Sequence, residues 1–209
     1  MGAEVSDALL RVRSLGRGRR VRRPAKTGYE EVCRRIVGVL TQAKVPYMIV
    51  GGLASSYYGC PRATYDLDLA VELEEGSVRR LLRLAGRAGF RFHEREVLLL
   101  ARTGNRFVME SPERYRVDFR LAKTPLEREM LARRRRTRIF GMPVWVCRPE
   151  DLILEKLRSA RPRDLEDVQA VLARQSDELD GEYLKRRAAE LGLSGLLEEQ
   201  RKLAVVSSS

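Results

Sequence analysis

The sequence predicts an α+β fold, in which a mixed β-sheet with flanking helices is followed by a C-terminal helical region. Two observations predict the sheet. Residues 46–50 form an apolar run that ends at Gly51-Gly52, and residues 65–72 alternate between apolar and polar side chains, as a half-buried strand does. A third observation predicts the helical region, because apolar residues recur at helical spacing from Pro149 onwards.

The other elements follow in chain order. Helices are expected at residues 28–43, 51–59, 76–88 and 125–135, then after Pro149, at 163–174, near 180–191 and at 194–203. Strands are expected at residues 106–110 and 115–121, with a hairpin at 137–147 around Gly141. Residues 97–101 fit a strand or a helix, within a stretch, 90–121, that otherwise looks like β structure. We therefore divide the chain into a basic arm (1–26), an α/β domain (27–148) and a helical region (149–209).

The chain of 209 residues carries a formal net charge of +12, which favours polyanionic partners such as nucleic acid or nucleotides. Half of this charge lies in residues 1–26, where eight basic residues face only Glu4 and Asp7. Two interpretations stay open for this arm. It is either a flexible, solvated tail or a segment that follows a nucleic-acid backbone.

The cysteines and the single histidine exclude several kinds of site. Cys33, Cys60 and Cys147 are widely spaced and form no C-x-x-C pair, so neither a disulfide framework nor a zinc site is expected. His93 is expected on the surface or in a loop. The sequence has no apolar run long enough to span a membrane and no signal-peptide core at its start, so we expect a cytoplasmic protein with no membrane partner.

The predicted strand 65–72 places Asp66 and Asp68 on one face, about 7 Å apart at the usual rise of a strand. The turn at Gly51 and Gly52 leads into a short helix whose first backbone N–H groups are free to bind an anion. Carboxylates suit a divalent metal, and backbone N–H groups suit a polyphosphate. Together they outline a site for phosphoryl transfer.

Two blocks resemble the nucleotidyltransferase superfamily. Val50-Gly51-Gly52 followed by Arg62-x-Thr64-x-Asp66-Leu67-Asp68-Leu69 resembles its hG[GS] and D-h-D-h signature. The block from Arg148 to Lys156, followed by Arg161, Asp164 and Asp167, is similar to the helical block of AbiEii-type and related minimal nucleotidyltransferases. These include toxins of toxin–antitoxin pairs. The expected fold is therefore the nucleotidyltransferase-like mixed sheet.

The resemblance implies catalytic and metal-binding roles for three aspartates. Asp66 and Asp68 would hold one or two Mg²⁺ (or Mn²⁺) ions, which bridge the nucleotide's phosphates. Asp118 would be the third metal ligand and the general base toward the acceptor hydroxyl. Two alternatives stay open: Asp118 is a surface residue paired with Arg116 or Arg120, or Glu72 is the third carboxylate.

The resemblance also implies a set of nucleotide contacts: Gly51, Gly52, Ser55 or Ser56, Arg62 and Lys156. The two glycines would let backbone N–H groups reach the phosphates, helped by one serine hydroxyl. Lys156 would meet the triphosphate as a point charge, but a solvent-facing lysine explains it equally well. Asp164 and Asp167 fit a helix that begins near Pro162 without any chemical role.

The second conspicuous basic run is Arg133-Arg134-Arg135-Arg136, with Arg138 close behind. It is either a solvated face or a surface that guides an RNA acceptor through its phosphates.

The function expected is metal-dependent transfer of a nucleoside monophosphate from an NTP to an acceptor hydroxyl, with release of pyrophosphate. The resemblance to toxin members makes a tRNA 3′ end one acceptor and a cognate antitoxin one partner, while an antibiotic or a protein side chain stays open. A different class of function is a catalytically silent or antitoxin-like binding module. A third is simple RNA binding through basic residues.

Overall fold

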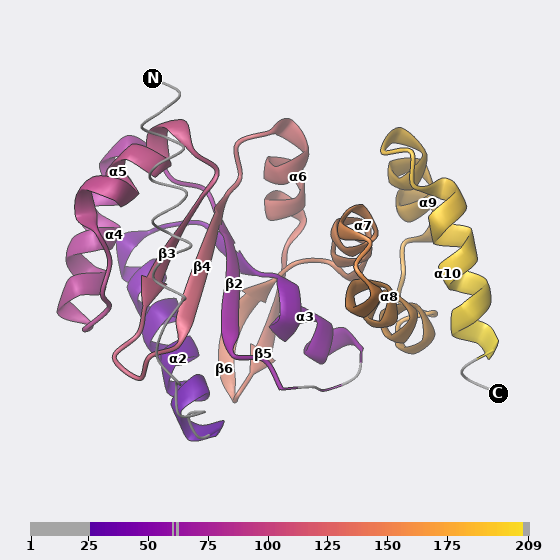
Figure 1. The fold of residues 1–209 in the computed structure, drawn as a ribbon, viewed down its shortest axis with the longest axis horizontal. Coiled ribbons are helices and arrows are strands. Elements are labelled where there is room, and N and C mark those ends of the chain that lie inside the picture. Colours follow the sequence, from indigo (N-terminus) through magenta and orange to yellow (C-terminus); the bar gives the residue numbers. More distant parts are fainter. Residues whose placement is uncertain (1–25, 60, 62, 207–209) are drawn as a thin grey trace.

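The computed structural model describes residues 26–59, 61 and 63–206 (Figure 1). Within these residues six strands and nine helices build the predicted α+β fold. The strands are β1 (Tyr47–Ile49), β2 (Asp66–Val71), β3 (Arg106–Glu110), β4 (Arg116–Leu121), β5 (Arg135–Ile139) and β6 (Met142–Val146). The helices are α2 (Lys26–Ala43), α3 (Gly51–Tyr58), α4 (Glu75–Arg87), α5 (Glu94–Thr103), α6 (Pro125–Arg133), α7 (Pro149–Ser159), α8 (Pro162–Arg174), α9 (Gly181–Glu190) and α10 (Ser194–Val206).

The strands form one mixed sheet in the order β3-β4-β2-β1-β6-β5. The pairs β2–β4 and β1–β6 are parallel, and the other three pairs are antiparallel. In the β2–β4 pair, Asp66 lies opposite Arg116 and Asp68 lies opposite Asp118. The mixed sheet with flanking helices that the sequence predicts is therefore confirmed.

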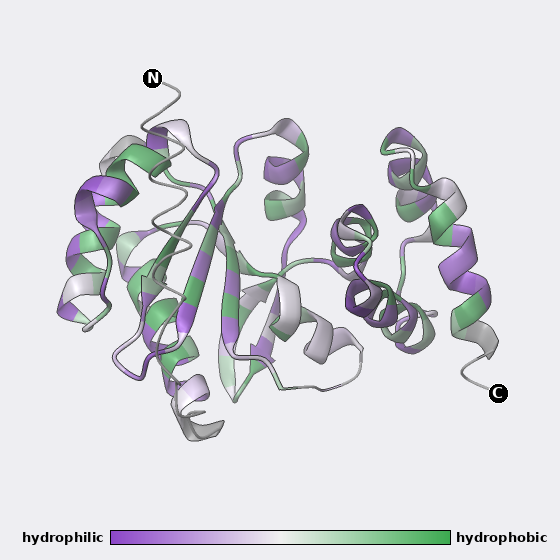
Figure 2. Cartoon of the chain, in the orientation of Figure 1, coloured by the Kyte–Doolittle hydropathy of each residue, from purple (hydrophilic) through white to green (hydrophobic). Residues whose placement is uncertain are grey.

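One face of the central strands forms the core. Leu67 and Leu69 of β2 and Val117 and Phe119 of β4 are buried, and their polar neighbours point to the other face. Phe119 stacks on the ring of Phe107 from β3, with 4.6 Å between the ring centroids. Figure 2 shows the resulting alternation of hydrophobic and hydrophilic residues along these strands. The opposite face of these strands carries their polar side chains.

The structure assigns one segment that the sequence left open and moves one predicted boundary. The ambiguous residues 97–101 belong to helix α5, and Val97 and Leu100 on one side of it are buried. Helix α6 ends at Arg133, and strand β5 begins at Arg135, two residues before the predicted hairpin. The arginine run therefore spans a helix end and a strand start, so its side chains cannot share one helical face.

Helices α7 and α8 pack against α3, the helix that follows the Gly-Gly turn (Figure 1). Two side chains at the end of α8 close this contact: Arg174 Nη1 donates to the carbonyl of Gly59 and Gln175 Nε2 donates to that of Tyr58, each at 3.1 Å. A Cβ on Gly59 would lie 3.1 Å from the Ala170 methyl group, so the two segments approach closely. None of the helices described is long and apolar enough to cross a membrane.

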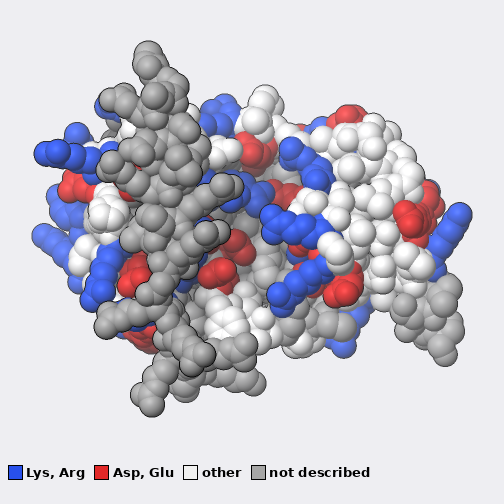
Figure 3. Space-filling view, in the orientation of Figure 1, with Lys and Arg blue, Asp and Glu red and all other residues white. Residues whose placement is uncertain are grey.

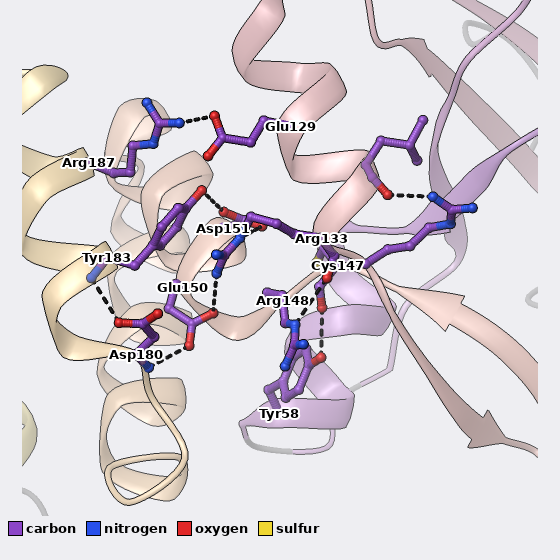
Figure 4. Close-up of polar contacts among 12 residues, drawn as sticks. Tyr58, Glu129, Arg133, Cys147, Arg148, Glu150, Asp151, Asp180, Tyr183 and Arg187 are labelled. Carbon is purple, nitrogen blue, oxygen red and sulfur yellow. Dashed lines mark hydrogen bonds and ion pairs between the residues drawn. The ribbon is translucent and has the colours of Figure 1, made fainter.

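A polar network joins α6 to α7 and α9 (Figure 4). The guanidinium of Arg133 lies 3.4 Å from the ring centroid of Tyr183, and its nitrogens lie 3.5 Å from Glu150 Oε2 and 3.6 Å from Asp151 Oδ2. Tyr183 Oη donates to Asp151 Oδ1 at 2.8 Å. Arg187 of α9 pairs with a glutamate of α6. The helices after Pro149 are thus held to the sheet domain by buried charges as well as by apolar packing.

Some predictions lie outside the described residues. These concern the arm before Lys26, the contact expected of Arg62, and Cys60. The thiols of Cys33 and Cys147 are buried and free.

Candidate active site

Three carboxylates lie side by side on the polar face of β2 and β4. Asp66 and Asp68 alternate with buried leucines along β2, and Asp118 stands directly opposite Asp68 on β4 in the parallel register. Directly opposite residues on neighbouring strands have their side chains close together on the same face. The structure therefore brings together the three aspartates singled out from the sequence.

The ionised forms of Asp66 and Asp68 are disfavoured in this position. Burial raises the pKa of the Asp66 carboxyl, and the negative charge of Asp118 raises it further. The pKa of Asp68 is raised in the same way, by burial first and by Asp118 second. A divalent cation relieves this kind of repulsion, and carboxylate oxygens are the ligands that Mg²⁺ prefers. The chemistry of Asp66 and Asp68 therefore suits a divalent metal ion.

Arg116 holds the third carboxylate. Its Nε lies 2.7 Å from Asp118 Oδ2, and its Nη2 donates to Asp118 Oδ1 at 2.8 Å, so both carboxylate oxygens contact the guanidinium. The hydrogen bond from Arg116 to Asp118 raises the pKa of the guanidinium. Among the described residues no three His, Cys, Asp or Glu side chains converge on one metal position. Asp118 is paired with Arg116 in this arrangement, and its role as a third metal ligand stays a prediction.

The Gly-Gly turn and the aspartates are in direct contact. Gly51 has a φ of +59°, and a Cβ at this position would lie 2.2 Å from Asp68 Oδ2. The backbone N–H of Gly52 donates to the same oxygen at 3.4 Å, and the N–H of Val50 donates to the Asp68 carbonyl at 3.0 Å. Only glycine fits here, because both the backbone conformation and the free space exclude a side chain. The first turn of α3 is thereby fixed beside the carboxylates, where its N–H groups favour an anion.

The two serines of α3 are turned toward their own helix. Ser55 Oγ donates to the Gly51 carbonyl and Ser56 Oγ donates to the Gly52 carbonyl, each at 3.0 Å. Ser55 is buried, while Ser56 is half-buried. Both hydroxyls lie on the helix that the Gly-Gly turn begins, one turn beyond the glycines, and the nucleotide contact predicted for one of them stays a prediction.

An ion pair that the sequence analysis did not predict lies on the same face. Arg120, two residues after Asp118 on β4, points to the polar side and pairs with Glu155 of α7. Burial raises the pKa of Glu155, although the charge of Arg120 lowers it. The strand period of two places Arg120 beside Asp118, but no sequence pattern links it to Glu155, 35 residues further on. Glu72, the other predicted third carboxylate, follows the end of β2 and pairs with Arg128 at 3.7 Å.

Lys156 has carboxylate partners within the helical region. Its Nζ lies 2.8 Å from Asp164 Oδ1 and 2.6 Å from Asp167 Oδ2, and the lysine is buried between α7 and α8. Burial alone would raise the pKa of Asp164, but hydrogen bonds from Lys156 and Ser159 outweigh it and lower this pKa. The interpretation of Lys156 as a solvent-facing residue is wrong. Its predicted contact with the triphosphate stays a prediction.

The four arginines from 133 to 136 go to different partners. Arg133 enters the network with α7 and α9, Arg134 lies 4.7 Å from the ring centroid of Trp145, and Arg135 pairs with Glu178 at 3.3 Å. Arg136 is exposed on β5. Figure 3 shows acidic and basic side chains next to one another at the centre of the visible face, not a field of one sign. The structure therefore does not bring the run together as one basic patch.

Comparison with known proteins identifies the family. A family model described as an uncharacterised nucleotidyltransferase matches residues 21–205. The chain belongs to this family. It is therefore a nucleotidyltransferase, an enzyme of the class that transfers nucleoside monophosphates, and such enzymes generally use divalent metal ions.

Solved structures share the fold of this nucleotidyltransferase. The antibiotic-resistance factor ANT(2'')-Ia is 18% identical with a TM-score of 0.58, and the match covers 85% of this chain and 99% of that one. An antigenic nucleotidyltransferase-like protein from Paracoccidioides brasiliensis is 17% identical with a TM-score of 0.51, over 86% of this chain and 94% of that one. At such identities the similarity shows the fold alone. No curated protein matches the sequence.

Proposed function

We propose that this nucleotidyltransferase moves a nucleoside monophosphate from an NTP to a hydroxyl group of an RNA, with release of pyrophosphate. The observation that carries the proposal is the register of β2 and β4, which sets Asp118 opposite Asp68, the aspartate that contacts the first turn of α3. The net charge of +12 supports a polyanionic acceptor, and the tRNA 3′ end follows from the resemblance to toxin members.

Each group has one task in the proposed reaction. Asp66 and Asp68 would hold Mg²⁺, which supplies charge neutralisation at the phosphates and aligns the attacking and leaving oxygens. The backbone N–H groups of Gly51 and Gly52 would bind the phosphates that leave as pyrophosphate, in place of the contact between the Gly52 N–H and Asp68. Asp118, once released from Arg116, takes the proton of the acceptor hydroxyl. The bond from the α-phosphorus to the acceptor oxygen forms as the bond to pyrophosphate breaks.

The raised pKa values of Asp66 and Asp68 suit this role. A carboxyl whose ionised form is disfavoured by burial and by a like charge gains more from a nearby cation than an exposed one does. Binding of the metal ion and of the NTP phosphates should therefore be coupled to deprotonation of these groups, and Mg²⁺ affinity should fall as the pH is lowered.

The test is to incubate the enzyme with each labelled NTP, Mg²⁺ and total cell RNA, and to ask which NTP labels which molecule. Asp66→Asn should abolish labelling because one metal ligand is lost, while circular dichroism and thermal unfolding stay as in the wild type. Asp177→Asn, at an exposed position on the loop after α8, is the matched control and should label normally. Undiminished labelling by Asp66→Asn would exclude the metal role. Label on a small molecule or a protein, with none on RNA, would exclude the acceptor class.

The toxin–antitoxin role is a separate part of the proposal. It rests on the likeness of the block from Arg148 to Asp167 to AbiEii-type proteins, and the partner would be an antitoxin encoded by a neighbouring gene. Expression of the chain alone should stop growth in a way that Asp66→Asn relieves. Normal growth at high expression of the active enzyme would exclude it.

A further inference from the structure

On the polar face of β3, β4 and β2, the residues form three rows that cross the strands. Each row takes one residue from β3, one from β4 and one from β2. The first row is Glu110, Arg116 and Asp66, the second is Val108, Asp118 and Asp68, and the third is Arg106, Arg120 and Ala70. The middle row contains two of the three proposed metal ligands. The third row places two arginines directly opposite each other, next to Asp118.

The direction of the reaction follows from the order of the strands. Gly51 and Gly52 follow β1, which lies on the side of β2 away from β4. Pyrophosphate bound at these glycines therefore leaves toward the β1 side. In phosphoryl transfer the attacking and leaving oxygens lie roughly in line, so the acceptor hydroxyl must approach from the β4 side. Among the strands that the structure describes, β3 alone lies beyond β4, at the edge of the sheet.

The charge on this side is suited to phosphate. Like charges opposite each other on neighbouring strands are unfavourable unless a counter-charge is present. Arg120 has such a counter-charge, because its Nη1 pairs with Glu155. Arg106 is exposed and forms no ion pair within the part of the chain that the structure describes. The guanidinium of Arg106 and the remaining nitrogens of Arg120 are therefore positioned to bind an anionic group beside Asp118.

We propose that the face of β3 and β4 is the acceptor-binding surface, and that Arg106 and Arg120 contact the phosphates of an RNA strand whose terminal hydroxyl reaches Asp118. The proposal rests on the proposed function and names the surface that its acceptor uses. It differs from the expectation for the run from Arg133 to Arg136, three members of which are engaged within the chain. Val108 is half-buried and lies opposite Asp118, where its apolar side chain can pack against the sugar of the reacting nucleotide.

Binding of a fluorescently labelled single-stranded RNA of about ten nucleotides tests the surface, with anisotropy measured over a series of salt concentrations. Arg106→Gln should weaken binding about three- to tenfold, and the slope of log K against log salt concentration should fall by about 0.7, the value for one lost phosphate contact. Arg106→Glu should weaken it further. Arg83→Gln, at an exposed position of α4, is the matched control for a lost charge and should bind as the wild type.

A second measurement separates this inference from the proposed function. Binding of a fluorescent NTP analogue with Mg²⁺ should be the same in the wild type and in Arg106→Gln. Weaker RNA binding by Arg106→Gln in a protein that binds no NTP would support the surface and overturn the proposed transfer reaction. RNA affinity unchanged by Arg106→Gln but lowered by Arg136→Gln would overturn the surface, and so would the absence of RNA binding in an enzyme that transfers nucleotide to another acceptor.

Discussion

Gly51 brings the Gly-Gly turn into contact with the aspartates of β2. Its φ of +59° favours glycine, and the space that a Cβ would need is filled by Asp68 Oδ2, 2.2 Å away. Gly51→Ala should lower the free energy of unfolding by more than about 2 kcal/mol, since left-handed backbone alone costs an alanine about 1–2 kcal/mol. It should also abolish nucleotide transfer, because the carboxylate of Asp68 must move. Denaturant unfolding and the NTP labelling assay measure the two effects.

Gly141 supplies the matched control. Its φ of +73° is also left-handed, but a Cβ there would have no atom within 4 Å. Gly141→Ala should therefore cost only the backbone strain of about 1–2 kcal/mol and leave transfer intact. Equal losses of stability and activity in the two variants would mean that the contact between Gly51 and Asp68 has no special role.

Asp118 illustrates how one residue can satisfy two predictions. The sequence left open whether it is a third metal ligand or a surface residue paired with an arginine, and the structure provides both the position and the pair. The bidentate contact with Arg116 keeps the charge of Asp118 compensated, while Asp66 and Asp68 bear raised pKa values. Arg116 would then release Asp118 as a cation and an acceptor arrive.

At the scale of elements, Lys156 joins helices α7 and α8. Lys156→Met removes the only ammonium between Asp164 and Asp167 in the described structure and leaves two partly buried carboxylates facing each other. The free energy of unfolding should fall by about 3 kcal/mol, as expected when one partner of a buried ion pair is lost. Denaturant unfolding at neutral pH measures this loss.

A compensated variant decides whether Lys156 also binds nucleotide. Lys156→Met combined with Asp164→Asn and Asp167→Asn also removes the two carboxylate charges that Lys156 neutralised, and it should regain most of the lost stability. Full recovery of both stability and nucleotide affinity would contradict the predicted triphosphate contact. Recovery of stability with a persistent rise in KM for the NTP would support it.

Local patterns account for what the sequence could predict at this scale. The alternation along β2 and β4 depends on one buried face, and the Gly-Gly turn depends on backbone conformation. Both can therefore be predicted from residues that are close together in the sequence. Residues 97–101 form a short apolar run, which periodicity alone cannot assign, and they form a helix because one side of α5 packs on the core. The pair of Arg120 and Glu155 joins elements far apart in sequence. Only the folded chain reveals such a contact.

At the scale of the whole molecule, α6 shares a buried polar interface with α7 and α9 of the C-terminal part. The interface contains Arg133 of α6, Glu150 and Asp151 of α7, and Tyr183 of α9 (Figure 4). Arg133 Nε, Glu150 Oε2 and Asp151 Oδ2 are buried and form no hydrogen bond within the described residues. The charged atoms of these ion pairs lie 3.5 and 3.6 Å apart. The cost of removing the charges from water therefore outweighs the attraction between them. Burial raises the pKa of Asp151 to about 6, even though Tyr183 and Arg133 both favour its ionised form.

This raised pKa predicts how the stability of the whole chain depends on pH. An aspartic acid in an unfolded chain titrates near pH 4, about two units below Asp151 in the folded protein. The folded state then binds this proton more tightly than the unfolded state does, so the contribution of Asp151 to the free energy of unfolding falls as the pH rises from about 4 to about 6 and then levels off.

Asp151→Asn keeps an oxygen for the Tyr183 hydroxyl and cannot ionise, so it should remove this contribution. The difference in unfolding free energy between the two proteins, measured by denaturant at several pH values, should therefore change across that window and stay constant above it. A difference that is constant from pH 4 to pH 7 would mean that Asp151 titrates normally and that the interface tolerates its charge.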